Sequence, residues 1–214
     1  MVDILLALVQ GIGVTIGVTG LAIVIGLALG APIAALRLSS NRVLSFVAGA
    51  IVNVVRGVPA IVWLFFVFYG LGSSLVRFDP FTTAVLTLGV FAAAQFAEAY
   101  RGGLLSVPRG QTEAARVLGF GRVHVFTLVQ LPQALLAAIP AGATVAIGLL
   151  KESAVVSIIG VMDITGRASA AALRSSDDIL IYSLAAVLYI ALSIPVALLS
   201  RGVHGVLERR VHAR

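Results

Sequence analysis

Long apolar stretches alternate with short polar connections along the chain. A spanning helix needs about 20 predominantly apolar residues, and five stretches are candidates: residues 11–36, 43–71, 81–100, 134–150 and 179–200. Runs of this length and polarity are typical of membrane helices rather than of strands. The pattern therefore predicts an all-α integral membrane protein, in which residues 1–214 form a single transmembrane domain with five spanning helices.

One polar segment, residues 110–132, separates the third and fourth stretches and reads GQTEAARVLGFGRVHVFTLVQLP. Thr112 is a candidate N-cap for a helix that begins with Glu113, whose acid suits the positive end of the helix dipole. Gly119 can take the left-handed conformation that ends this helix. A second short helix is expected over residues 122–131, closed by the proline that follows. Two short helices with an apolar tip would suit a soluble partner, whereas an amphipathic helix in the lipid headgroups is an equal alternative on composition.

Arginine placement predicts the orientation of the spans. The connections after the first, third and fifth spans hold Arg37, Arg42, Arg101, Arg109, Arg116, Arg122, Arg201, Arg209, Arg210 and Arg214. The opposite side holds Arg77, Lys151, Arg167 and Arg174. Because cytoplasmic loops carry the excess of Lys and Arg, the N-terminus is expected outside and the C-terminus in the cytoplasm. The segment at residues 110–132 would then be cytoplasmic.

Composition agrees with a membrane protein. Of the 214 residues, 60% are hydrophobic and 11% charged, with a mean hydropathy of +1.10, whereas soluble domains carry about 25% charged residues. The net charge of +6 lies on arginines that flank apolar runs, so we expect contact with the membrane surface and no nucleic acid. The opening MVDILLALVQG has an acid instead of a basic n-region, and no cleavable signal peptide is expected.

Proline and glycine modify the expected spans. Pro59, Pro140 and Pro195 each remove a backbone donor, so the second, fourth and fifth spans are expected to be kinked or interrupted, the second at RGVP. Small residues recur in the first span at Gly13, Gly17, Gly20, Gly26 and Gly30, and two of these pairs are small-xxx-small patterns that permit close helix approach, although glycine is also simply common in membrane helices. The less apolar stretch GVMDITGRASAAALRSSDD between spans four and five predicts a short helix on the outer surface.

The sequence gives little indication of an enzyme. The three histidines, His124, His204 and His212, lack partners at metal-ligand or nucleophile-activating spacing, so neither a metal site nor a catalytic residue is predicted. The chain has no GxxxxGK[ST] phosphate loop and no cysteine. Energy for any transport must therefore come from another subunit, and no cofactor is expected on this chain.

Polar groups inside or beside the apolar runs are costly and point to function. They form three sets: Asn53 and Arg56 before the break; Gln95, Glu98 and Arg101 near the inner end of the third span; and Lys151, Glu152 and Ser153 after the fourth. Glu98 and Arg101 are three residues apart and could simply pair on a helix. For the third set, an interfacial ion pair and a role in gating or solute contact are equally open.

The order of residues in the polar segment resembles a known motif. EAARVLGFGRVHVFTLVQLP is similar to the EAA loop of bacterial ABC importer permeases, which has EAA, then Gly four residues later, then a hydrophobic residue and Pro about a dozen residues on. The matching positions are Glu113, Ala114, Ala115, Gly119, Leu131 and Pro132. RGVPAIVWLFFVFYG and LKESAVVSIIGV resemble elements of the polar amino-acid group of these permeases, with Val58 and Ala154 as departures.

The resemblance implies a type I importer permease subunit for histidine, glutamine, arginine, glutamate or a similar zwitterion. Such a subunit would be a multi-pass protein of the bacterial cytoplasmic (inner) membrane. Two permease subunits, a second copy or a paralogue, would form the pathway. A dimer of ATP-binding subunits, which holds ATP and Mg, would grip the EAA loop, and an extracytoplasmic solute-binding protein would deliver the solute.

The resemblance also implies residue roles. The EAA positions would couple to the ATPase, and Arg56, Gly57 and Pro59 would form a bend. Glu98, Lys151, Glu152 and Ser153 are weaker candidates for the pathway or its gates. Importers of opines or ectoine-like compatible solutes are alternatives, as is a membrane scaffold that recruits a soluble partner without transport. A passive channel is disfavoured because the spans show no filter-like sequence.

Overall fold

The computed structural model describes residues 2–71, 79–175 and 177–212. In chain order, its elements are α1 (Val2–Arg37), α2 (Arg42–Gly57), α3 (Ala60–Phe65), the π-helical η1 (Phe66–Leu71), α4 (Pro80–Leu105), α5 (Arg109–Val117), α6 (Arg122–His124), the π-helical η2 (Val125–Gln130), α7 (Leu131–Glu152), the 3₁₀-helical η3 (Ser153–Ile159), α8 (Ile164–Ala172) and α9 (Asp178–His212). Every element in these ranges is helical, as the apolar pattern predicts.

Four helical runs in the described ranges are long and apolar enough to span a membrane, and a fifth span is possible if the bent pair α2 and α3–η1 counts as one. The expected count of five therefore depends on this pair. The runs are longer than the hydropathy pattern indicated: α1 begins at Val2 instead of residue 11, and the fourth run extends from Arg122 to Ile159. Residues 4–9 of α1 are themselves apolar, and the polar side chains before residue 134 do not end the helical run that begins at Arg122.

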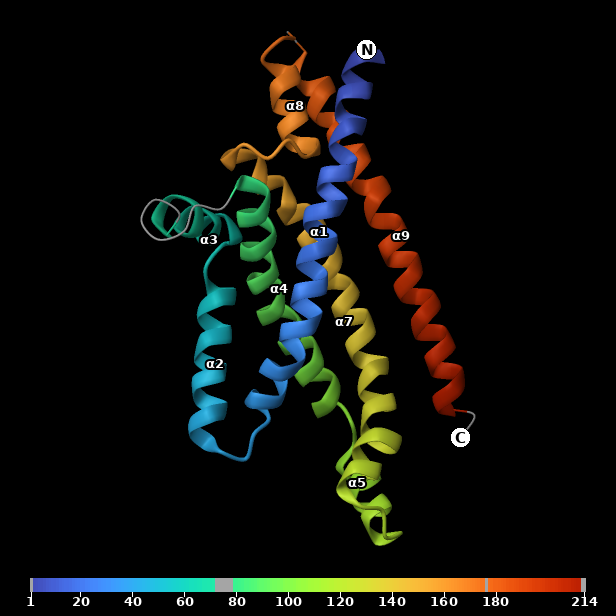
Figure 1. The fold of residues 1–214 in the computed structure, drawn as a ribbon. Helices are drawn as coiled ribbons and strands as arrows, with labels where there is room; N and C mark the ends of the chain where they lie inside the picture. Colours follow the sequence, from blue (N-terminus) through green and yellow to red (C-terminus); the bar gives the residue numbers. More distant parts are fainter. Residues whose placement is uncertain (1, 72–78, 176, 213–214) are drawn as a thin grey trace.

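The long helix α1 lies at the centre of the molecule and packs along α4 (Figure 1). Gly26 and Gly30 make this approach possible, since a Cβ at Gly26 would lie 2.6 Å from the Ala92 Cβ and one at Gly30 would lie 2.9 Å from the Phe96 Cβ. The close approach is present at Gly26 and Gly30, as their spacing predicted. It is not present at Gly13, where a Cβ would meet nothing within 4 Å, and a Cβ at Gly17 would meet only the Phe81 ring, at 3.6 Å.

The second apolar stretch is broken at its middle. Helix α2 ends at Gly57, and the chain turns by 97° into α3. Val58 adopts an extended conformation (φ −105°, ψ 132°), which is the conformation that a following proline favours. The indole Nε1 of Trp63 donates to the Val55 carbonyl at 3.1 Å, so one of the carbonyls left unpaired at the end of α2 is satisfied.

Prolines affect the other spans less than expected. Pro140 and Pro195 lie inside α7 and α9, and neither interrupts its helix. The helix expected to close at Pro132 also continues, because Pro132 lies in the first turn of α7, directly after the π-helical turns of η2. A proline ring clashes with the carbonyl four residues earlier in a regular α-helix, and the wider π turn relieves that clash.

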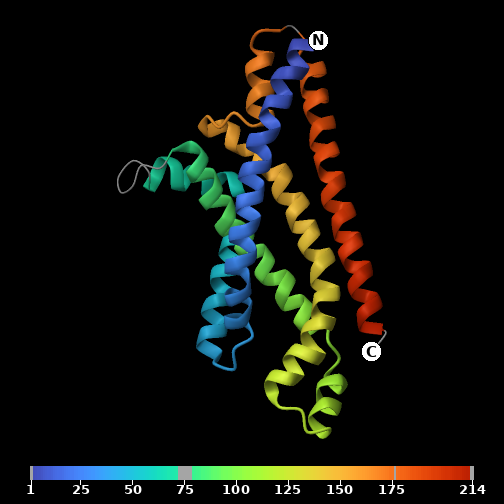
Figure 2. The same cartoon turned by 45° about the vertical axis from the view of Figure 1, so that its right-hand side comes forward.

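The two ends of the molecule are built differently. Helix α8 and the N-terminus lie at one end, and α5 lies at the opposite end, with the C-terminal part of α9 pointing toward the α5 end (Figures 1 and 2). The short helix expected between the fourth and fifth spans is therefore present as α8. We refer to these two regions below as the α8 end and the α5 end.

Candidate functional site

The polar segment at the α5 end folds as a helix, a turn and a second helix. Helix α5 begins at Arg109 after Pro108, so the expected start at Glu113 with a Thr112 cap is wrong. Proline fixes its own φ and directs the chain into a helix four residues earlier than the cap pattern indicated. Thr112 instead lies inside α5, where its hydroxyl accepts a hydrogen bond from Gln130 Nε2 at 3.3 Å.

Gly119 ends this helix in the left-handed conformation, with φ +83°. Its N–H donates to the Arg116 carbonyl at 3.0 Å, and the Phe120 N–H donates to the Ala115 carbonyl at 3.1 Å. This pair of bonds is the Schellman arrangement that glycine favours at a helix C-terminus. The expected conformation of Gly119 is therefore present, and it fixes the angle at which the chain enters α6.

The turn between α5 and α6 exposes an apolar tip. Val117 is 87% and Leu118 76% exposed, and Val123 and Phe120 are exposed beside them. Glu113 and Ala114 are exposed as well, whereas Ala115 is 5% exposed and packs inside the loop. Exposed apolar side chains in one place mark an interaction surface. The small size of Ala115 serves the loop's own packing, while Ala114 and Leu118 are exposed.

Glu98 of α4 lies among three arginines. Its Oε1 and Oε2 accept hydrogen bonds from Arg101 Nε at 3.1 Å and Arg101 Nη2 at 3.0 Å. Arg37 Nη1 at the end of α1 contacts Oε1, and Arg56 Nη1 at the end of α2 lies 3.8 Å from Oε2. The pairing of Glu98 with Arg101 that the spacing suggested is present. Two further helices join it, which sequence spacing alone could not reveal.

The third polar set lies apart from this cluster, where α7 passes into η3. Ser153 is fully buried, and its hydroxyl donates to the Leu150 carbonyl at 2.8 Å. Lys151 is exposed and Glu152 is half-buried. Among the described residues no ion pair joins Lys151 to Glu152. The interfacial ion pair expected as one alternative is therefore not formed in this conformation.

A buried junction at the α8 end was not predicted as a site. Asp163 is fully buried and caps α8, with Oδ1 accepting from the Gly166 N–H at 2.8 Å and Oδ2 from the Tyr189 hydroxyl at 2.9 Å. The Ile164 N–H donates to the Thr15 hydroxyl of α1 at 3.2 Å. The junction thus joins α1, α8 and α9. An Asp directly before a helical run is an N-cap pattern, and this pattern could have revealed it.

Burial sets the ionisation of this carboxyl. Loss of solvent raises the pKa of Asp163 above its ordinary value, and the hydrogen bonds from Gly166 and Tyr189 oppose that shift. Gly11 of α1 completes the contact, because a Cβ there would lie 2.7 Å from the Asp163 carbonyl. We interpret the junction as a brace that fixes the α8 end.

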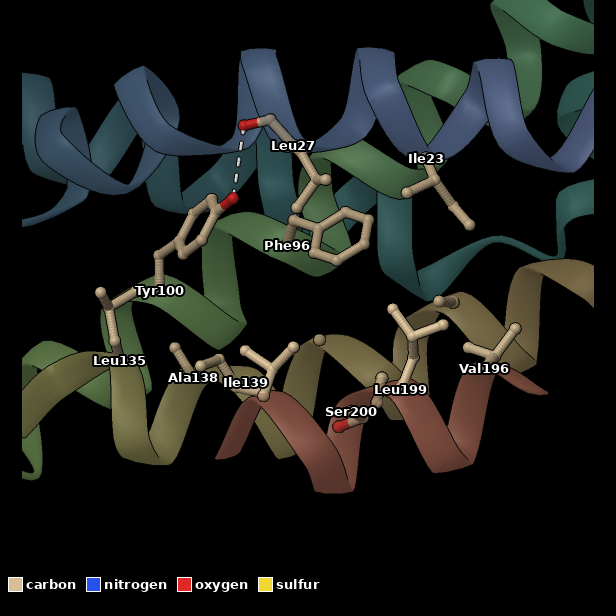
Figure 3. A pocket seen from close by; sticks show the side chains of 14 residues that line it. Ile23, Leu27, Phe96, Tyr100, Leu135, Ala138, Ile139, Val196, Leu199 and Ser200 are labelled. Atoms are coloured by element: carbon tan, nitrogen blue, oxygen red, sulfur yellow. Dashed lines mark hydrogen bonds between the residues drawn. The ribbon is translucent and has the colours of Figure 1, made fainter. Parts of the chain in front are cut away.

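An apolar cavity of about 360 Å³ lies between α1, α4, α7 and α9. Figure 3 shows its lining, in which Leu27, Phe96, Ile139 and Leu199 meet across the space. The Tyr100 hydroxyl points to the Leu27 carbonyl at 3.5 Å. A zwitterion needs charged or hydrogen-bonding partners for both of its groups. The lining of this cavity has almost no charged or hydrogen-bonding side chains, so we do not assign a polar solute to it.

Comparison with known proteins agrees with this arrangement. The family model for the binding-protein-dependent transport system inner membrane component matches residues 8–213. The L-cystine transport system permease protein TcyL of Bacillus subtilis (strain 168) is 34% identical over 188 residues, which cover 85% of this chain and 79% of TcyL. The octopine transport system permease protein OccM of Rhizobium radiobacter is 32% identical, over 89% of this chain and 82% of OccM.

A solved structure is similar over nearly the whole chain. It is the crystal structure of an amino acid ABC transporter with histidines, with a TM-score of 0.86 and 32% identity over 98% of this chain and 96% of that one. The chain belongs to the family of binding-protein-dependent transport system inner membrane components. Within it, the chain is a type I ABC importer permease subunit of the polar amino-acid family, a multi-pass protein of the bacterial cytoplasmic membrane.

Proposed function

We propose that this permease forms the transmembrane pathway of an ATP-driven importer for polar amino acids and that α5 couples it to the ATPase. The observation that carries this proposal is the shape of the α5 end. A short helix held by the Gly119 turn presents Val117 and Leu118 to a partner. Of the EAA positions, Glu113, Ala114 and Ala115 lie in α5, Gly119 lies in the turn, and Leu131 and Pro132 begin α7.

The helical connections suggest how movement at α5 reaches the membrane. Thr112 of α5 is hydrogen-bonded to Gln130, and from Arg122 the helical run continues through α7 to Ile159. When the ATP-binding subunits close and move α5, the continuous helical run that contains α7 would therefore move with it. Its far end carries Lys151, Glu152 and Ser153, which become candidate gate residues. Such a switch requires different contacts in the two states. Because Lys151 and Glu152 form no ion pair with each other in this conformation, either side chain could form a new contact in the other state.

This mechanism implies an orientation and a set of partners. The α5 end lies in the cytoplasm against a dimer of ATP-binding subunits, which hold ATP and Mg. The α8 end lies outside and receives the solute-binding protein. One chain offers too few spans to enclose a solute path, so a second permease subunit, either a second copy or a paralogue, completes it. Arg56, Gly57 and Pro59 form the bend at which α2 and α3 change their relative angle.

A polar amino acid is the solute that this family membership favours. An opine is the second candidate, because OccM belongs to an octopine transport system and is 32% identical. A compatible solute of the ectoine type is chemically similar in being a zwitterion. The α-carboxylate and a nitrogen cation are common to the first two candidates. Uptake assays with the complete importer would separate them.

A membrane scaffold that binds a soluble protein through α5 without transport is the rival from another class. Cysteine cross-linking separates the two, and the chain has no cysteine of its own. An L118C variant, purified in mild detergent from its native membrane, should cross-link to an ATP-binding subunit. An L173C variant, at a residue that is 90% exposed at the α8 end, should not. Cross-linking of L118C only to a protein without ATPase activity would favour the scaffold.

A further inference from the structure

The cluster around Glu98 is unbalanced in charge. One carboxylate serves Arg37, Arg56 and Arg101, so the four side chains together carry a formal charge of +2. No other acidic side chain forms an ion pair with these arginines in the described part of the chain. Unpaired positive charge within a membrane protein is costly, so such residues point to a functional site.

Arg56 is the arginine that this carboxylate satisfies least. Arg37 and Arg101 occupy Oε1 and Oε2 at closer range, and Arg56 lies 3.8 Å from Oε2 with a side chain that is 40% exposed. Arg37 is 14% and Arg101 31% exposed. The open face of the cluster is therefore the guanidinium of Arg56. Guanidinium groups bind carboxylates and phosphates through paired N–H donors.

Both a solute carboxylate and a lipid phosphate have the chemistry that this guanidinium binds, and the labelling experiment below separates them. Arg56 lies 14 residues after Arg42, the first residue of α2, which corresponds to about 21 Å at 1.5 Å per residue. Glu98 lies seven residues before Leu105, the last residue of α4, or about 10 Å along that helix. Lipid headgroups lie at the surface, outside a hydrocarbon core of about 30 Å. Arg37 is the last residue of α1, so the cluster extends from the end of α1 to the bend after α2.

We propose that Arg56, supported by Arg37 and Arg101, binds the carboxylate of the transported amino acid as it passes the bend between α2 and α3. The inference rests on the proposed importer function and names the chemical group that the pathway recognises. Glu98 is a positioning residue in this account, because it holds Arg37 and Arg101 beside Arg56 while leaving the cluster positive. Solute that lacks a carboxylate would gain nothing from the site.

Thiol labelling tests the site without an activity assay. R56C would be treated in the purified complex with an anionic sulfonate and a cationic ammonium methanethiosulfonate. V54C is the matched control, since Val54 is also exposed on α2 but lies about 200° around the helix from Arg56. The remaining charge of Arg37 and Arg101 should raise the sulfonate-to-ammonium rate ratio about tenfold above that of V54C. R101Q in the R56C background should reduce the ratio toward that of V54C.

Protection identifies the ligand. L-Histidine, L-cystine and octopine would be added separately to R56C, with histamine as the matched amine without a carboxylate. Slower labelling with at least one of the three, and none with histamine, supports the proposal. An unreactive R56C or a ratio equal to that of V54C would overturn the anion site. Protection by none of the three, or only by phosphatidylglycerol vesicles, would overturn the carboxylate assignment. Co-purification of an ATP-binding subunit reports on the importer function separately from these outcomes.

Discussion

Two polar clusters join α1 to later helices, and they differ in the groups that neutralise or hydrogen-bond the carboxylate of each cluster. At the α8 end, the carboxylate of Asp163 accepts from a backbone N–H and from a hydroxyl and is fully buried. Nearer the α5 end, the carboxylate of Glu98 is shared among three guanidinium groups, and its side chain remains 19% exposed. The first cluster has one charge and neutral partners. The second contains four charges.

This difference separates a brace from a responsive site. Neutral hydrogen-bond partners hold the Asp163 side chain in one arrangement. No repulsion between these groups favours another conformation. The arginines around Glu98 repel one another, so their arrangement depends on what anion lies between them. An importer needs both properties, since one end must keep its shape while the pathway changes. The same chemical change at the two carboxylates should therefore have unequal effects.

The largest expected effect comes from E98Q, compared with D163N. Glu98 is the one acid that pairs with these arginines among the described residues, so its removal leaves three arginines without that counterion. Breaking such a pair costs about 3–5 kcal/mol when buried, so we expect about 3 kcal/mol at this partly exposed site. D163N should cost under about 1 kcal/mol, because the amide can still accept from Gly166 and can donate to Tyr189. Thermal unfolding of both purified variants measures the difference. Equal losses would contradict the contrast.

Gly11 provides the next largest effect, at the brace. G11A would place a Cβ 2.6 Å from the Ile164 nitrogen and 2.7 Å from the Asp163 carbonyl, so α1 and the start of α8 must separate. Overpacking of this kind costs about 1–3 kcal/mol. G13A is the control, because a Cβ at Gly13 meets nothing within 4 Å. The free energy of unfolding should fall in G11A and stay near the wild-type value in G13A.

Gly119 tests the loop at the α5 end. G119A introduces a Cβ at φ +83°, which costs about 1 kcal/mol for the backbone alone, since no atom lies within 4 Å of the added group. G121A is matched, because Gly121 is equally open but has φ −68°. In the reconstituted importer, G119A should lower solute-stimulated ATP hydrolysis while G121A leaves it unchanged. Similar rates in the two variants would weaken the role of the turn.

The smallest expected effect is a pH dependence at the brace. Because burial raises the pKa of Asp163 in the folded protein, the folded state favours the protonated carboxyl. Stability from this group is present below the ordinary pKa and is lost as pH rises through the folded pKa. Lowering the pH from about 7.5 toward the ordinary range of an aspartic acid, about 4, should therefore raise the protection factors of the α8 amides, which are exchange rates corrected for their intrinsic pH dependence, as measured by mass spectrometry. In D163N, the part of this pH dependence that comes from Asp163 should be absent.

Much of the fold could be predicted from sequence because membrane helices have a strong apolar pattern. The all-helical architecture, the left-handed Gly119 and the short helix α8 agree with that prediction. The start of α5 could not be placed because two patterns competed, an N-cap threonine and a preceding proline, and the proline prevailed. Pro132 was misread because a proline usually ends a helix, and sequence does not show the π-helical turns of η2 that accommodate it.

The polar clusters were harder to predict, because their members come from distant parts of the chain. Spacing paired Glu98 with Arg101, three residues away, but could not bring in Arg37 or Arg56 from other helices. Asp163 and Tyr189 are likewise 26 residues apart and on different helices. Local patterns predict helix contacts within a turn or two, whereas tertiary packing decides which polar groups meet across helices.

Reconstitution of the complete importer tests the central claim most directly. The permease, its co-purified ATP-binding subunits and its solute-binding protein would be placed in liposomes, and uptake of radiolabelled histidine, cystine and octopine would be followed. The account predicts ATP-dependent accumulation of at least one of these carboxylate-bearing solutes, which is lost when the L118C site on α5 is cross-linked. Uptake that needs no ATP, or ATP hydrolysis that is indifferent to every solute, would contradict it.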